Sequence, residues 1–239
     1  MEKKSGIKEV IILAGGFGTR LQKVVKDVPK PMAEINGRPF LSYLLDYYEK
    51  QGVEHIILSI GYLGKVIRDY FGEKFGKMTL SYALEEKPLG TGGAIIHSLR
   101  YAQHDLVMVV NGDTMFKIKF EEVYQFHLKK QSDFTMVIRQ VEDVSRYGSV
   151  FLSEEGRIVG FAEKNSHSGA GYINGGVYLL NKNLLTTRSF PEKFSIEKDF
   201  FEKEYNHYNM FGKVCNGYFI DIGIPEDYQK AQIDFAKGI

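Results

Sequence analysis

A glycine-rich run near the start of the chain has the composition of a phosphate-binding loop. Residues 13–21 read Leu-Ala-Gly-Gly-Phe-Gly-Thr-Arg-Leu, and Pro29-Lys30-Pro31 follows. Glycine has no Cβ, so backbone N–H groups in such a loop can approach a polyphosphate closely. Arg20 and Lys30 would add the positive charge that densely packed phosphate oxygens require from several directions. The pattern therefore predicts a grip for a nucleoside triphosphate.

The spacing separates this loop from two other phosphate-binding loops. A dinucleotide-binding fingerprint needs a third glycine where Leu21 stands, and a Walker loop needs Gly-Lys-Ser/Thr at residues 18–20. For the glycines alone, a turn that uses them only for steric reasons is the alternative. With Pro-Lys-Pro added, the pattern resembles the sugar-1-phosphate nucleotidylyltransferase family, whose signature is a strand, Gly-Gly-x-Gly-Thr-Arg-Leu and then Pro-Lys-Pro.

A second glycine cluster occupies residues 88–93, between a predicted strand and a helix predicted at 94–102. The amino end of a helix suits anions and polar rings. The resemblance implies that this loop cradles the base of the nucleotide, whereas a capped loop-to-helix junction is the structural alternative.

The residue that reads the base would precede this cluster. Guanine presents N1–H and an exocyclic amine, which one carboxylate can accept together, while uracil or thymine suits an amide. The family places its base-reading side chain five residues before the glycine that aligns with Gly90, which is Glu85 here, with Glu86 as the neighbouring alternative. Glu85 therefore indicates guanine, although exposed glutamates at strand ends are common.

Two aspartates follow strand-like segments that lie far apart in the chain. Asp113 follows the predicted strand 106–110, which puts it at the carboxyl edge of the sheet, where open α/β folds bind ligands. Asp221 ends the run 217–222. Mg²⁺ prefers a couple of carboxylates with phosphate oxygens and water. The resemblance puts metal-binding aspartates at these points and so implies Mg²⁺ on Asp113 and Asp221, each of which could otherwise be a turn residue.

A third group of residues resembles the sugar-phosphate pocket of the family. Glu163-Lys164 follows the predicted strand 158–162, and Gly148 and Asn174-Gly175 lie in neighbouring β segments. By resemblance, Lys164 meets the sugar phosphate, Glu163 accepts hydrogen bonds from sugar hydroxyls, and the glycines let the ring lie close to the backbone. A lone Glu-Lys pair is otherwise typical of a solvated surface.

The nucleotide-binding residues that the resemblance implies are Leu13, Ala14, Gly15, Gly16, Gly18, Thr19, Arg20, Lys30, Glu85, Pro88, Gly90, Thr91 and Gly112. The implied catalytic residues are cations. Arg20 would act on the leaving pyrophosphate, Lys30 and Mg²⁺ on the transferring phosphoryl group, and Lys164 on the incoming sugar phosphate. A phosphate monoester is largely dianionic at pH 7, because its second pKa is about 6, so no general base is needed.

The elements that position these residues alternate between strand and helix in the first half and are β-rich in the second. This order predicts an α/β fold with a Rossmann-like, mixed and mainly parallel sheet flanked by helices, as in nucleotidyltransferases and A-type glycosyltransferases. We expect one domain, residues 1–239, with a nucleotide-binding half at about 1–133 and a sugar-phosphate half at about 134–239. The strand candidates are 10–13, 55–60, 80–84, 106–110, 135–141, 149–152, 158–162, 172–180 and 217–222.

Two helices are predicted outside the glycine motifs. One starts at Pro39 and ends at Gly52, and its apolar residues recur at helical spacing. The other runs from Pro225 to about Ala236 and is expected to pack through Tyr228, Ile233 and Phe235.

Composition excludes several function classes. Lys+Arg 31 against Asp+Glu 30 gives a net charge of +1, so no global field attracts nucleic acid or an anionic membrane. The single cysteine, Cys215, excludes an internal disulfide and is expected in the core, and the six histidines show no metal-ligand spacing. The apolar run near the N-terminus is too short for a signal peptide or a membrane span. These features predict a cytoplasmic enzyme and are compatible with a homodimer.

The resemblance runs from about Val10 to Tyr228 and is closest to heptose 1-phosphate guanylyltransferases, through residues 29–32, 36–41, 88–94 and 221–228. It implies transfer of GMP from GTP to D-glycero-alpha-D-manno-heptose 1-phosphate, which gives GDP-heptose for capsule or surface polysaccharide. Mannose 1-phosphate or another hexose 1-phosphate stays open as acceptor. Mannose enzymes often add a β-helix after the catalytic domain, and this sequence ends at Ile239.

Two other function classes fit less well. A metal-dependent glycosyltransferase usually shows Asp-x-Asp, and Asn111 stands at the first acid. A non-catalytic sensor of nucleotide-sugars would have lost a charged catalytic residue. This sequence retains all five charged residues assigned to catalysis or metal binding, which are Arg20, Lys30, Asp113, Lys164 and Asp221.

Overall fold

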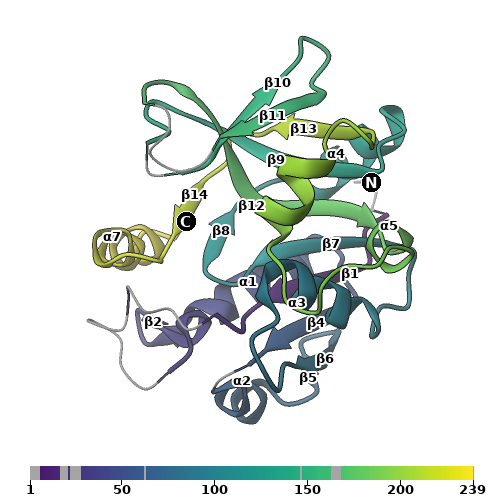
Figure 1. Ribbon diagram of the computed structural model, residues 1–239. Helices are drawn as coiled ribbons and strands as arrows, with labels where there is room; N and C mark the ends of the chain where they lie inside the picture. The colour runs from purple at the N-terminus through teal and green to yellow at the C-terminus, as the bar shows by residue number, and fades with distance from the viewer. Residues whose placement is uncertain are drawn as a thin grey trace.

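One mixed sheet, parallel at its centre, runs through the molecule (Figure 1). The computed structural model describes residues 6–16, 21, 28–61, 63–145, 147–162 and 168–238. The strand order is β11-β10-β12-β7-β1-β4-β6-β5, with β9 beside β12 and β13 beside β9. The parallel centre consists of β7 (Leu106–Asn111), β1 (Glu9–Leu13), β4 (His55–Ile60) and β6 (Met78–Leu84).

Antiparallel pairs extend this centre on both sides, and β13 pairs in parallel with β9. The outer strands are β5 (Lys74–Phe75), β9 (Phe134–Val141), β10 (Ser149–Leu152), β11 (Ile158–Ala162), β12 (Gly171–Asn181) and β13 (Met210–Val214). Two small ladders stand outside the sheet. They are β2 (Glu34–Ile35) with β3 (Arg38–Pro39), and β8 (Thr114–Phe116) with β14 (Phe219–Asp221).

Helices pack against both faces of the sheet and form two apolar cores. One core takes residues from α1 (Phe40–Lys50), α2 (Gly64–Phe71), α4 (Phe120–Lys129) and α7 (Pro225–Ala236), and the other from α3 (Gly90–Leu99) and the π-helix η3 (Ile196–Phe201). β1 contributes to both, because Val10 and Ile12 belong to the first core and Ile11 to the second. The short helices are η2 (Lys30–Met32), α5 (Asn183–Thr186) and α6 (Glu202–Glu204).

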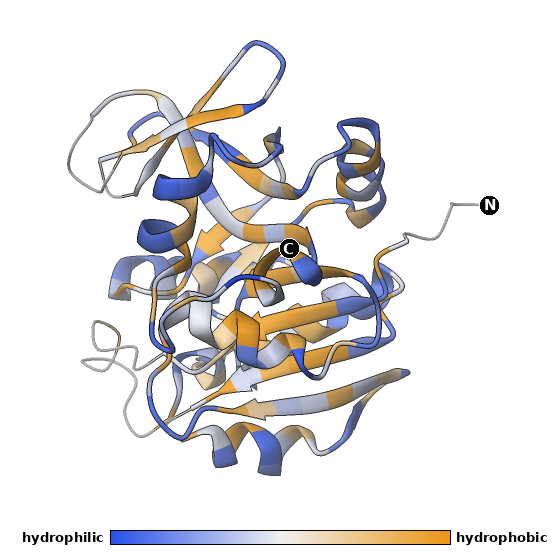
Figure 2. Cartoon of the chain, turned by 45° about the vertical axis from the view of Figure 1, so that its right-hand side comes forward, coloured by the Kyte–Doolittle hydropathy of each residue, from blue (hydrophilic) through white to orange (hydrophobic). Residues whose placement is uncertain are grey.

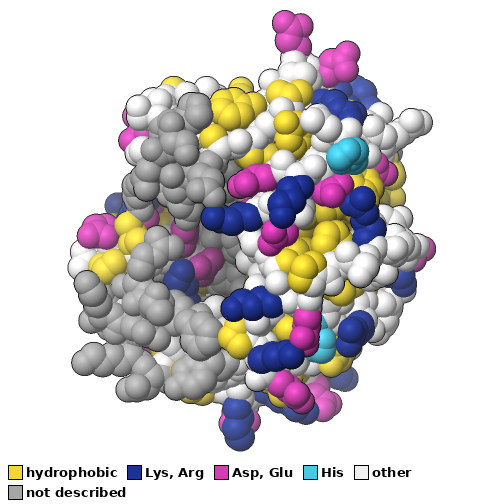
Figure 3. Space-filling view, in the orientation of Figure 1, with side chains coloured by type: hydrophobic (Ala, Val, Ile, Leu, Met, Phe, Trp, Pro, Cys, Tyr) yellow, Lys and Arg dark blue, Asp and Glu magenta, His cyan; other side chains and the backbone are white. Residues whose placement is uncertain are grey.

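The central strands form because they are short, continuous apolar runs, which suit strands buried on both faces. Figure 2 shows these strands in orange, while blue residues gather on helices and loops. Acidic and basic side chains are mixed on the face in Figure 3, in keeping with the net charge of +1. Among the described residues, no helix is both long and apolar enough to cross a membrane.

The predicted fold class is confirmed, and the predicted strands occur with ends that differ by a few residues at most. The second glycine cluster is itself helical, since α3 begins at Gly90 rather than at Ala94. The expectation for Ile233 is wrong, because its side chain is 57% exposed. The buried positions on α7 are Ala231 and Phe235, one turn apart, so Ile233 between them faces away. Cys215 is half-buried against the first core.

Candidate functional site

A lysine and two aspartates converge beyond the carboxyl end of β7. Lys30 begins η2, and its Nζ lies 2.5 Å from Oδ2 of Asp113, in the turn after β7. The two side chains are only 14% and 26% exposed. This part-buried ion pair joins the Pro-Lys-Pro motif to the edge of the central sheet.

Asp221 reaches the same place through the ladder of β8 and β14. Asp221 pairs opposite Thr114, and Ile222 N donates to the carbonyl oxygen of Asp113 over 2.9 Å. A Cβ built on Gly223 would lie 2.8 Å from Oδ1 of Asp221 and 2.9 Å from Nζ of Lys30. Gly223 therefore lies beside the ends of both side chains, which places Asp221 and Lys30 at the same point of the site.

The two carboxylates fit a magnesium ion. Oxygen donors are what Mg²⁺ takes from proteins, and it is usually bound by one or two carboxylates together with substrate phosphates. Within the described ranges, no cluster of three or more His, Cys, Asp or Glu side chains could hold a metal without a substrate. Asp113 and Asp221 therefore suit a metal that arrives with phosphate oxygens.

The first glycine motif leaves β1 at the same edge of the sheet. Ala14 N donates to the Ser59 carbonyl over 2.8 Å, and Gly112 N donates to the Leu13 carbonyl over 2.9 Å, so the loop starts between β4 and β7. Leu13, Ala14, Gly15 and Gly16 are described, whereas Gly18, Thr19 and Arg20 lie outside the described residues.

Glu85 follows β6 and points toward this loop. Its Oε1 accepts from Ser59 Oγ at 3.0 Å, and its Oε2 accepts from Leu89 N at 3.1 Å. A Cβ built on Gly15 would lie 2.8 Å from Oε1, so the carboxylate stands directly beside the first glycine motif. Glu86 is exposed. The structure thus brings Glu85, and not its neighbour, to the place predicted for the base reader.

The second glycine cluster, residues 88–93, is packed against residues 192–197. A Cβ on Gly90 would lie 2.5 Å from the Phe194 carbonyl oxygen, and one on Gly92 would lie 2.1 Å from the Phe194 ring. A Cβ on Gly93 would lie 2.4 Å from the Glu192 carbonyl oxygen. These glycines are explained by packing within the protein. The sequence alone indicated base binding or a capped loop-to-helix junction for this cluster, and did not indicate the contact with residues 192–197.

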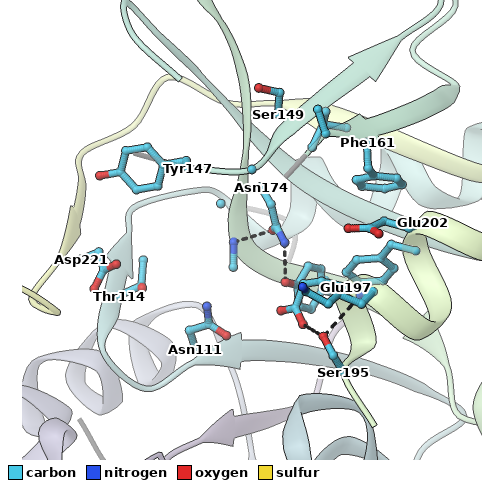
Figure 4. A pocket seen from close by; sticks show the side chains of 18 of the residues that line it. Asn111, Thr114, Tyr147, Ser149, Phe161, Asn174, Ser195, Glu197, Glu202 and Asp221 are labelled. Atoms are coloured by element: carbon cyan, nitrogen blue, oxygen red, sulfur yellow. Dashed lines mark hydrogen bonds between the residues drawn. The ribbon is translucent and has the colours of Figure 1, made fainter. Parts of the chain in front are cut away.

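A cavity of about 460 Å³ opens beside Asp221. Figure 4 shows Asp221, Thr114 and Tyr147 at one end of it and Phe161 and Glu202 at the other. The predicted sugar-binding residues Gly148, Asn174 and Gly175 line it, while Glu163 and Lys164 lie outside the described residues.

Asn174 is held in place by an irregularity in β12. The register with β9 shifts between Asn174 and Tyr178, and Gly176 within the shift has φ +68°. Asn174 Oδ1 accepts from Gly176 N at 2.8 Å, and its Nδ2 donates to Tyr178 Oη over 2.7 Å. Burial, together with the nearby charge of Glu197, raises the pKa of Tyr178. Tyr178 therefore stays a neutral hydroxyl in the wall of the cavity.

Sequence reasoning missed one wall of this cavity. It consists of Ser195, Glu197, Lys198 and Glu202, in and around η3. From the sequence these residues were assigned to no element or motif, and their place becomes visible only when η3 packs against α3.

A second cavity, of about 600 Å³, lies behind residues 88–93. Two of the cations that line it are paired, since Lys87 meets Glu192 and Arg188 meets Glu204, each at 2.8 Å. This cavity therefore adjoins the second glycine cluster, whose residues Leu89 and Gly93 line it.

Comparison with known proteins agrees with this geometry. Residues 9–238 match the family model described as nucleotidyl transferase. The chain is 44% identical over 224 residues to D-glycero-alpha-D-manno-heptose 1-phosphate guanylyltransferase of Aneurinibacillus thermoaerophilus, which covers 94% of this chain and 96% of that one. It is 32% identical to a mannose-1-phosphate guanylyltransferase of Mycobacterium tuberculosis, over 97% of this chain and 65% of that one.

A solved structure shows the same fold with a bound nucleotide. HddC from Yersinia pseudotuberculosis, complexed with GMP-PN, superposes with a TM-score of 0.86 at 40% identity, over 96% of this chain and 100% of that one. The family model and these relatives show that this chain belongs to the nucleotidyl transferase family.

Proposed function

We propose that this chain transfers GMP from GTP to a sugar 1-phosphate, with D-glycero-alpha-D-manno-heptose 1-phosphate as the acceptor and GDP-heptose and pyrophosphate as products. The observation that carries the choice of GTP is the Glu85 carboxylate beside the first glycine motif. The names of the relatives in Aneurinibacillus and Yersinia support the same donor, and the former supports the heptose.

The three parts of the site lie in the order that this reaction needs. Glu85, the proposed base reader, stands at the glycine loop, the Lys30 and aspartate cluster lies at the end of β7, and the cavity that we propose for the sugar is lined by Asp221. A sugar phosphate oxygen in that cavity could attack the α-phosphorus in line and expel pyrophosphate. Such a reaction depends on positioning and on charge neutralisation.

Lys30 would place its charge on the transferring phosphoryl group. Asp113 and Asp221 would hold Mg²⁺, which when bound supplies further neutralisation of phosphate charge. Asn174 and the backbone at Gly148 and Gly175 would contact the sugar, and Tyr178 would keep Asn174 in position. Arg20 on the pyrophosphate, and Glu163 and Lys164 on the sugar phosphate, remain predictions from the sequence.

The first experiment measures pyrophosphate release with four nucleoside triphosphates against a panel of hexose and heptose 1-phosphates, with MgCl₂ or with EDTA. GTP with the heptose 1-phosphate and MgCl₂ should give the highest kcat/KM, at least about tenfold above UTP, and EDTA should abolish turnover. Reactions without a sugar phosphate control for hydrolysis of the nucleotide.

Each arm of this experiment can fail separately. Equal use of UTP or dTTP would refute guanine selection by Glu85. A higher kcat/KM with mannose 1-phosphate would replace the acceptor and leave the reaction class. Full activity in EDTA would refute the role of the two aspartates.

A further inference from the structure

Residues 192–197 join the second glycine cluster to the sugar cavity. Phe194 N donates to the Leu89 carbonyl, and Gly92 N donates to the Phe194 carbonyl, each over 3.0 Å. Phe190 stacks on Phe194 with ring centroids 4.6 Å apart. The base loop, residues 88–93, is therefore fixed to a segment whose continuation lines the cavity.

Thr91 makes the side-chain connection between the two. Its Oγ1 donates to Oε2 of Glu197 over 2.8 Å and accepts from Ile196 N over 2.9 Å. The Thr91 hydroxyl is thus a donor to Glu197 and an acceptor from Ile196. Thr91 does not line the cavity, whereas Glu197 does.

Glu197 is held through one of its two oxygens. Ser195 Oγ also donates to Oε2, over 2.7 Å (Figure 4), so the hydroxyls of Ser195 and Thr91 together fix the carboxylate. Among the described residues, Oε1 has no hydrogen-bond donor. A carboxylate fixed at one oxygen and open at the other is suited to accept from a hydroxyl of a ligand, and sugars present several such donors.

We propose that Glu197 is a positioning residue shared by both substrate sites. Thr91 of the base loop sets the orientation of the carboxylate, and the carboxylate accepts from a sugar hydroxyl in the cavity. This inference rests on the proposed function, because it takes the cavity as the sugar site. It follows that a change in the base loop alters the binding of sugar 1-phosphate even when no nucleotide is present.

The test is Thr91→Val, which keeps the shape of the side chain and removes its hydroxyl. Binding of D-glycero-alpha-D-manno-heptose 1-phosphate and of mannose 1-phosphate is measured by calorimetry without nucleotide. Thr91→Val loses the hydrogen bond that orients the Glu197 carboxylate. We therefore expect an approximately tenfold rise in the Kd of the sugar phosphate, taken for whichever of the two wild type binds. Thr91→Ser keeps the hydroxyl and should bind like wild type. Thr186→Val, on α5, is the matched control, because that threonine is exposed and does not line the cavity.

A double-mutant cycle with Glu197→Ala identifies the route. If Thr91 acts through Glu197, Thr91→Val should have no further effect on sugar binding once Glu197 is removed. Additive effects would overturn the proposal, as would a Kd in Thr91→Val within threefold of wild type, or a Thr91→Ser protein as weak as Thr91→Val. Thermal melts establish that each variant is folded, and Glu197→Gln replaces Glu197→Ala if the latter is not.

The outcome for the proposed function is separate. Wild-type protein that binds neither sugar phosphate without nucleotide would overturn this inference, whereas the proposed function stands or falls with the release of pyrophosphate. If wild type and Thr91→Val bind one of the sugar phosphates with the same Kd, only the role of Glu197 is refuted.

Discussion

At the scale of single residues, the Glu85 carboxylate is oriented through both of its oxygens, which suits the base-reading role proposed for it. Ser59 Oγ and Leu89 N each hold one of its oxygens. Each carboxylate oxygen can accept two hydrogen bonds, so one position on each remains for guanine. Because both donors are neutral, they orient the carboxylate and leave its negative charge for the base.

This arrangement predicts that the exocyclic amine of guanine is read by Glu85. GTP should be preferred over ITP, which lacks that amine, by about one to two orders of magnitude in kcat/KM, since one hydrogen bond to a charged group is lost. Glu85→Gln should lower the ratio of kcat/KM for GTP to that for ITP, and it should also lower the ratio for GTP over UTP. Initial rates with the three nucleotides measure it.

Glu86→Gln is the matched control, because Glu86 is exposed and adjacent in sequence. A larger effect at Glu86 than at Glu85 would move the role by one residue. Equal rates with GTP and ITP in wild type would show that the amine is not read.

The residues that sequence reasoning located are those carried by short motifs. Lys30, Asp113 and Asp221 were expected at one place, and the structure brings them together. Glu197 was missed because its partner Thr91 lies about a hundred residues earlier, and no spacing rule connects them. Contacts between distant segments depend on packing, which a single sequence does not display.

At the scale of elements, the two glycine motifs need glycine for different reasons. In the second motif, a Cβ on Gly92 would meet the buried Phe194 ring at 2.1 Å. In the first motif, a Cβ on Gly16 would meet nothing within 4 Å among the described residues. Gly92 is therefore constrained by packing, while Gly16 has open space beside it, where the sequence predicts a phosphate chain.

Gly92→Ala and Gly16→Ala should therefore separate stability from binding. Overpacking in Gly92→Ala should cost about 1–3 kcal/mol. Alanine in place of glycine stabilises a helix by only about 1 kcal/mol, so we expect a net loss of stability. In a chain of this size, Gly92→Ala should lower Tm by a few degrees. Gly16→Ala should leave Tm unchanged and weaken GTP binding. Thermal melts and nucleotide titration distinguish the two, and an equal loss of Tm in both would contradict this assignment.

Elements were predictable where a local pattern of residues marks them. β4, β10 and β11 occur at the predicted residues, because short β-rich or apolar runs mark them, and α7 does so because Pro225 followed by two acidic residues marks its start. β13 was not predicted, since the run Met-Phe-Gly-Lys-Val is short and interrupted by glycine and lysine. It becomes a strand by pairing with β9, a contact across more than 70 residues.

At the scale of the whole molecule, buried ionisable groups connect stability to pH. Burial would raise the pKa of the Glu9 carboxyl, but hydrogen bonds from His55 and from the backbone of Gln103 and His104 lower it overall. Glu9 is fully buried at the start of β1 and ties β4 to the loop before β7. Burial lowers the pKa of His127 from 6.5 to about 4, despite an opposing effect of Asp133.

His127 should make the fold less stable in mild acid. The unfolded chain takes up a proton at this histidine below pH 6.5, whereas the folded protein resists it until about pH 4. The free energy of unfolding should therefore fall as pH falls from 6.5 to 4, by on the order of 3 kcal/mol from this group. In His127→Gln that part of the slope should be absent. Urea unfolding at several pH values measures it.

His104→Gln is the control, because it removes an exposed imidazole. An identical slope in wild type and His127→Gln would show that His127 does not set the acid sensitivity. A Gln at 127 can still meet Thr135 Oγ1, which contacts His127 Nδ1 at 2.9 Å, so the comparison is between folded proteins.

The contact between Lys30 and Asp113 makes the lysine a competitor of any incoming cation for that carboxylate. The Lys30 ammonium lies 2.5 Å from Asp113 Oδ2, where it already supplies one positive charge. If Mg²⁺ binds as proposed, loading the site would be an exchange, in which a divalent ion takes the place of a tethered monovalent one. The displaced ammonium stays on its backbone and needs a new anion nearby, which the phosphates of a nucleotide would provide. Lys30 would thus serve as a resident counter-ion that changes partner when the substrate arrives.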